Sequence, residues 1–98
     1  MTDEQSGKVI YVRGDVDFDS HLDVEHALVS ALEAGADPLV VDLSEVPFLD
    51  SSGVRALLQA RSVAERHNAR LTVRDPQPIV AQVLRLTNVA PLLGLPPA

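Results

Sequence analysis

Hydrophobic residues along this chain fall into short continuous runs separated by longer amphipathic stretches. Three runs are rich in Val, Ile and Leu, the composition typical of β-strands, and they cover residues 8–13, 39–43 and 71–73. The run 39–43 is almost entirely apolar, as expected for a strand that is buried on both faces. We therefore predict three strands, with the second at the centre of a sheet.

Between these runs, hydrophobic residues follow the spacing of helices. The first predicted helix is capped by Asp19 or Ser20 and ends at Gly35. The second begins at Ser51 and Ser52 and runs toward residue 68. The residues expected to be buried are Leu22, Leu28, Ala31 and Leu32 in the first helix, and Val54, Leu57, Leu58 and Ala64 in the second. Each pattern predicts a helix with one face packed on the sheet.

A third helix is predicted after the last strand, with Asp75 as its cap and prolines in its first turn. Its expected apolar positions are Ile79, Val80, Val83 and Leu84. The alternation of strands and helices predicts an α/β domain over residues 8–93, with a mostly parallel or mixed sheet and about three helices packed on it. Residues 1–7 are expected to form a mobile acidic tail, and residues 94–98 an irregular C-terminal tail.

Composition and charge narrow the classes of function. Aromatic residues make up 3% of the chain, so the core must be built from aliphatic side chains. A net charge of −6 opposes the phosphate contacts that dominate nucleic-acid affinity. The chain has no cysteine, which fits a reducing compartment. No apolar run approaches the ~20 residues that cross a bilayer, so we expect a cytoplasmic protein that binds neither nucleic acid nor membrane.

The candidate chemistry lies in the segment Asp50-Ser51-Ser52-Gly53, which follows the central strand and opens the second helix. Open α/β sheets place their sites at the carboxyl ends of their strands. A helix N-terminus has unpaired N–H groups and a partial positive charge, so it accommodates a phosphate. Ser51 is therefore a candidate phosphoacceptor. The alternative is that Ser51 and Ser52 serve only as N-caps of the helix.

The run from Val40 to Gly53, VVDLSEVPFLDSSG, resembles the signature of the STAS family, and in particular of its single-domain anti-sigma factor antagonists. The turn Gly14–Asp17 is similar to a turn of that family, and Pro78–Thr87 is similar to its third helix. The resemblance extends over most of the chain. It implies a fold with further elements at both ends, so we expect a STAS-like domain that is trimmed at both ends.

The resemblance also implies a mechanism. In this family the serine after the motif's aspartate, here Ser51, is phosphorylated by an anti-sigma factor that is a serine kinase of the GHKL type. The unphosphorylated antagonist binds the kinase and releases the sigma factor, and a phosphatase resets the switch. Asp50 would orient the acceptor hydroxyl. The expected switch loop and partner surface contain Asp17, Asp50, Ser52, Gly53, Val54 and Arg55; Arg55 stands where a small residue is common.

Other functions remain as alternatives. One is a STAS scaffold or transporter-associated subunit that does not switch, and another is a hydrolase that uses Ser51, although a Gly-x-Ser-x-Gly elbow is missing. Asp15–Asp19 resembles the start of an EF-hand loop, but Ser20 and His26 stand where the loop needs Gly and Glu. We therefore expect no metal, no cofactor and no enzymatic activity, and a homodimer is a further candidate assembly.

Overall fold

Three parallel strands form the sheet, and the second lies between the other two. The computed structural model describes residues 7–96. The strands are β1 (Lys8–Arg13), β2 (Leu39–Glu45) and β3 (Leu71–Arg74), in the order β1-β2-β3. Both pairs are parallel, so the prediction of a small α/β domain with a central second strand is confirmed. Residues 1–6 of the predicted N-terminal tail and residues 97–98 of the predicted C-terminal tail lie outside the described residues.

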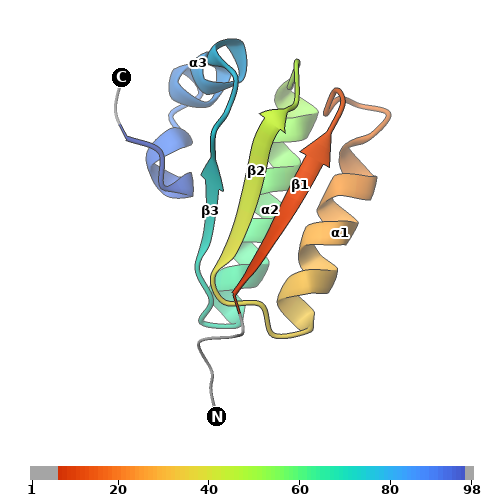
Figure 1. Ribbon diagram of the computed structural model, residues 1–98, viewed down its shortest axis with the longest axis vertical. Helices are drawn as coiled ribbons and strands as arrows, with labels where there is room; N and C mark the ends of the chain where they lie inside the picture. Colours follow the sequence, from red (N-terminus) through yellow and green to blue (C-terminus); the bar gives the residue numbers. More distant parts are fainter. Residues whose placement is uncertain (1–6, 97–98) are drawn as a thin grey trace.

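Two helices pack together on one face of the sheet. They are α1 (His21–Glu33) and α2 (Ser51–Arg66). Figure 1 shows α2 behind the strands and α1 next to β1, on the side away from β2. The side chains of β2 that face them, Leu39, Val41 and Leu43, are fully buried. The core consists of aliphatic side chains from these layers. The opposite face of the sheet is not covered by a helix in Figure 1.

The buried stripe of α1 differs from the predicted one. Leu28 and Leu32 are buried as expected, but Leu22 is 64% exposed. Six residues of helix correspond to about 600°, so Leu22 lies about 120° away from Leu28 around the axis. Val24, which is partly buried against the core, occupies the place on the stripe that we assigned to Leu22.

Two predictions for the third helix, α3 (Pro78–Leu86), are also wrong. Its N-cap is Gln77, because Asp75 lies in a turn with a left-handed φ of 54°. Ile79 is 56% exposed, because it lies on the side of the helix away from the buried Val80 and Leu84. No helix within residues 7–96 combines the length and the apolar character needed to span a membrane.

The chain after α3 packs against β3. A short 3₁₀ helix, η2 (Ala90–Leu93), follows α3, and it buries Leu93 completely. Gly94 follows with a left-handed φ of 80°, and a Cβ at this position would lie 2.8 Å from Cγ2 of Thr72. This close approach, together with the buried Leu95, holds the C-terminal segment against the outer side of β3.

Candidate functional site

Two loops meet at the carboxyl edge of the sheet. One follows β1 and contains Val16; the other follows β2 and contains Phe48 and Asp50. The N–H of Val16 donates to the carbonyl of Phe48 at 2.9 Å, and the N–H of Asp50 donates to the carbonyl of Val16 at 3.2 Å. Val16 also forms a parallel bridge with Leu49. These bonds bring the loop of Asp17 beside the start of α2.

The first turn of α2 is seated directly on this junction. A Cβ at Gly53 would lie 2.7 Å from the carbonyl oxygen of Val16 and 2.8 Å from Cγ of Leu49. Only glycine leaves room for the helix to approach so closely. Val54 is also buried. Gly53 and Val54 therefore support the predicted surface from below and do not contribute exposed side chains to it.

Asp50 is the N-cap of α2. Its Oδ1 accepts hydrogen bonds from the N–H groups of Ser52 at 2.8 Å and Gly53 at 3.1 Å. The alternative in which the serines cap the helix is therefore wrong, because a carboxylate already satisfies these donors. The two N–H groups are also not free for a phosphate, contrary to the expectation for a bare helix N-terminus.

Ser51 lies at the exposed start of α2, and Ser52 is half-buried. Within residues 7–96, neither hydroxyl makes a hydrogen bond to the protein. Since Oδ1 of Asp50 is engaged by the helix N–H groups, its predicted role in orienting the Ser51 hydroxyl remains a prediction. The geometry leaves the Ser51 hydroxyl accessible and free of a structural task.

Asp17 holds the neighbouring loop in shape. Its Oδ1 accepts hydrogen bonds from the N–H groups of Asp19 at 3.0 Å and Ser20 at 3.2 Å, and from the Ser20 hydroxyl at 3.2 Å. The Asp17 carboxylate, which belongs to the segment that resembled a calcium loop, is thus engaged in hydrogen bonds within its own turn. No group of His, Cys, Asp and Glu suited to a metal ion occurs within the described part of the chain. Arg55 is exposed on α2.

Three large hydrophobic residues around this edge are exposed, which the sequence analysis did not predict. Phe18 is 76% exposed, Leu22 is 64% exposed and Phe48 is 45% exposed. Phe18 lies 5.9 Å from the ring of His21, and Phe48 belongs to the loop that leads to Ser51. Phe18 stands between two aspartates in the sequence, a context that already disfavours burial. Exposed apolar side chains of this size are typical of binding surfaces.

Comparisons with known proteins assign the family. The family model described as "Mlab, STAS domain" matches residues 1–94. A STAS-domain containing protein of Pseudomonas aeruginosa (strain UCBPP-PA14) is 31% identical over 86 residues, which are 88% of this chain and 84% of that protein. The chain belongs to the STAS family. The high affinity sulfate transporter 2 of Stylosanthes hamata is 30% identical over 56 residues, or 57% of this chain and 8% of the transporter's length.

Two solved structures resemble the fold of this STAS domain. The anti-sigma factor antagonist SpoIIAA in its unphosphorylated form has a TM-score of 0.74 and 23% identity, over 85% of this chain and 73% of that one. The Bacillus cell fate determinant SpoIIAA in the phosphorylated form has a TM-score of 0.68 and 20% identity, over 93% of this chain and 83% of that one. At this level of identity the likeness shows a shared fold.

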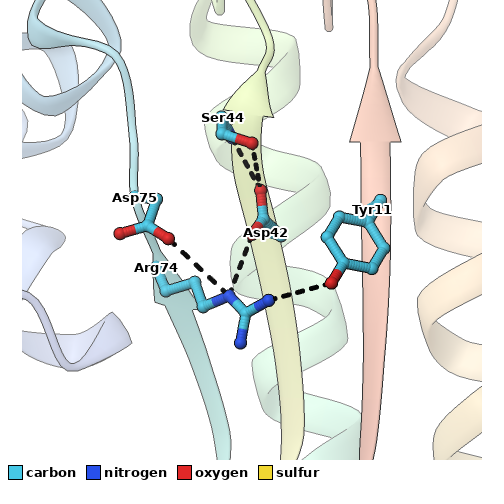
Figure 2. Close-up of polar contacts among 5 residues, drawn as sticks. All are labelled: Tyr11, Asp42, Ser44, Arg74 and Asp75. Atoms are coloured by element: carbon cyan, nitrogen blue, oxygen red, sulfur yellow. Dashed lines mark hydrogen bonds and ion pairs between the residues drawn. The ribbon is translucent and has the colours of Figure 1, made fainter.

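The open face of the STAS sheet carries a cluster of polar side chains centred on Asp42. Asp42 is 4% exposed, and Figure 2 shows it between Arg74 and Ser44. Nε of Arg74 donates to Oδ2 of Asp42 at 2.9 Å, and the Ser44 hydroxyl donates to Oδ1 at 2.6 Å. Nη2 of Arg74 also donates to the Tyr11 hydroxyl at 3.1 Å. The cluster links all three strands.

These contacts favour the charged form of Asp42. The hydrogen bond from the Ser44 hydroxyl, followed by that from Arg74, lowers the pKa of Asp42 from 3.8 to about 2. A carboxyl group whose pKa is lower in the folded protein stabilises the fold above its unfolded pKa, and this contribution is lost as the pH falls through the folded pKa. The loss from Asp42 is therefore expected between about pH 4 and pH 2.

We expect Asp42→Asn to lower the melting temperature at neutral pH and to reduce the further loss between pH 4 and pH 2. Thermal melts followed by circular dichroism over this range measure both effects. Asp75→Asn is the matched control, because the Asp75 carboxylate is 3.8 Å from the same Nε of Arg74 but is exposed. An Asp42→Asn protein whose melting temperature falls with acid as steeply as that of the wild type would contradict the prediction.

Proposed function

We propose that this STAS domain is an anti-sigma factor antagonist in the cytoplasm, a binding module without enzymatic activity, and that phosphorylation of Ser51 is its switch. The proposed partner is an anti-sigma factor that is also a GHKL-type serine kinase and supplies ATP and magnesium. Binding to unphosphorylated Ser51 would release the sigma factor, and a phosphatase would reset the switch. The observation that carries the proposal is the exposed, unengaged Ser51 hydroxyl at the first residue of α2.

The surroundings of Ser51 suit a protein partner. Phe18, Leu22 and Phe48 offer apolar contacts, and Arg55 adds a charged side chain one turn into α2. Aromatic residues and arginine are enriched in protein interfaces. Fold similarity to SpoIIAA, which has been solved in phosphorylated and unphosphorylated forms, supports the same assignment.

A phosphate on Ser51 would change this surface by its charge. It adds about −1.5 to −2 charges at neutral pH directly beside the Asp50 carboxylate. Because the N–H groups of Ser52 and Gly53 are bonded to Asp50, the phosphate would project outward, into the space of a docked partner. The positive end of the α2 dipole offsets part of the repulsion within the fold. The expected effect is therefore loss of the partner while the domain stays folded.

Affinity capture from cells, followed by intact mass and fragment-ion mapping, tests the function. The tagged wild-type chain should retain a GHKL-type kinase, and the purified kinase with ATP should add one phosphate to Ser51. Ser51→Ala is the control that should not be phosphorylated, and Ser52→Ala should be phosphorylated like the wild type. Phosphate on Ser52, or the absence of any kinase partner, would count against the proposal.

A second candidate is a STAS subunit that associates with a transporter and does not switch. The similarity to part of a sulfate transporter favours it. In this case the same capture experiment would retain a transporter component, and Ser51 would carry no phosphate. The two functions thus differ in both partner and modification, and one experiment separates them.

A further inference from the structure

Within residues 7–96, the outer side of β1 is an unpaired edge of the sheet. Within the described residues, β1 pairs only with β2. The N–H of Lys8 donates to the carbonyl of Pro38, at the start of β2, at 3.0 Å. Because peptide groups of a parallel strand alternate between its two sides, those of Lys8 and Ile10 face β2 and those of Val9 and Tyr11 face outward. The edge therefore presents N–H and C=O groups that can bind another strand.

A groove runs beside these outward peptide groups. It has a volume of about 190 Å³ and lies between residues 10–13 of β1 and the α1 residues Asp23, Val24, Ala27 and Leu28. Figure 1 shows α1 beyond β1, on the side away from β2. A strand added beside β1 would therefore pack against α1. Alternate side chains of such a strand would contact Val24 and Ala27, which retain exposed surface.

We propose that this β1 edge binds an extended segment of a partner protein as a fourth strand. The segment has hydrophobic residues at alternate positions, which fill the groove, and acidic residues at its ends, beside Lys8 and Arg13. Both basic residues are exposed. Arg13 also forms an ion pair with Glu45 at 3.3 Å, so an acidic residue of the segment would share Arg13 with Glu45. Main-chain hydrogen bonds to Val9 and Tyr11 would give affinity, and the alternate side chains would give specificity. This site does not involve Ser51.

A single strand fits this edge better than the alternatives do. A second copy paired through its own β1 would bring its own α1 beneath the joined strands, where the first α1 already lies. Residues 1–6 contain one hydrophobic residue, Met1, so they cannot offer alternating apolar side chains to the groove. A separate extended segment brings no second helix beneath the strands, and an alternating pattern supplies the apolar side chains that the groove can hold.

A synthetic heptapeptide, acetyl-EVTVTVE-amide, is a suitable probe. In NMR titrations it should shift the amide signals of Val9 and Tyr11 and slow their hydrogen exchange. Val9→Pro removes an outward N–H and leaves the β1–β2 bonds in place, as proline at a strand edge allows, and it should weaken binding at least tenfold. Ala27→Arg, which obstructs the groove from α1, provides a second test if the proline variant is unstable. Ser51→Asp should bind the peptide like the wild type.

Several results would overturn this inference. Equal binding of the peptide to the wild type, Val9→Pro and Ala27→Arg, or no binding at millimolar concentration, would remove the site. A dimer in sedimentation experiments that Val9→Pro abolishes would identify a second copy as the occupant. If deletion of residues 1–6 exposed the Val9 and Tyr11 amides to faster exchange, the chain's own N-terminus would be the occupant.

Discussion

Replacement of Gly53 by alanine should lower the free energy of unfolding by about 1–3 kcal/mol, the range for overpacking a close-packed core. The added Cβ would lie 2.7 Å from the Val16 carbonyl oxygen and 2.8 Å from Cγ of Leu49. One of these contacts is with backbone that is itself hydrogen-bonded to Asp50. The methyl group can be accommodated only if α2 moves away from the two joined loops.

Denaturant unfolding of Gly53→Ala and Ser52→Ala measures this effect. Ser52→Ala is the matched control, because it lies in the same turn and keeps the N–H that Asp50 binds. It removes a hydroxyl that makes no hydrogen bond to the protein within residues 7–96. It should unfold within about 0.5 kcal/mol of the wild type, as is usual for substitutions away from special features. A Gly53→Ala protein as stable as Ser52→Ala would contradict the prediction, because it would show that the two loops can move to accommodate the methyl group at little cost in stability.

The positions of the strands could be predicted because they depend on local composition. The β-branched run at the start of the domain gave β1 with its observed bounds, Lys8–Arg13. The side chains of β2 that face the helices are buried in the core. On the other face of the sheet, Asp42 is shielded from solvent by the side chains of Arg74 and Ser44. A short apolar run such as that of β2 is informative because it is typical of a buried strand.

The buried side of each helix was harder to predict. Leu22 and Ile79 are hydrophobic and lie within helices, yet both are exposed. In a short helix several sets of hydrophobic residues fit a stripe almost equally well, and the choice depends on the neighbour against which the helix packs. The sequence alone does not specify that neighbour.

The candidate site was predictable as a segment, but its geometry was not. The motif located Ser51 at the start of a helix, and the structure agrees. The alternative interpretation placed the cap on the serines, which are good N-caps, although Asp50 is equally suitable by residue type. The parallel bridge between Val16 and Leu49 joins segments far apart in the sequence, and nothing local indicates it.

The largest functional effect is expected from phosphorylation of Ser51. We expect the phosphorylated domain to bind the proposed kinase partner at least tenfold more weakly than the unphosphorylated domain. Burial of a phosphate in an interface built for a neutral hydroxyl can cost several kcal/mol, and about 1.4 kcal/mol corresponds to a tenfold change in affinity. Asp50 increases this cost, because its carboxylate holds the nearest helix N–H groups.

Isothermal titration calorimetry with the purified kinase, in the absence of turnover, compares the two forms directly. Ser51→Ala should bind like the unphosphorylated wild type, and Ser51→Asp should be weakened in the direction of the phosphorylated form, since only the latter introduces charge. Melting curves of all four proteins provide the control: similar melting temperatures would assign the loss to the interface. Equal affinity of the phosphorylated and unphosphorylated proteins would exclude the switch, even if Ser51 is modified. A large fall in melting temperature on phosphorylation would instead mean that the charge acts on the fold, through Asp50 and the first turn of α2.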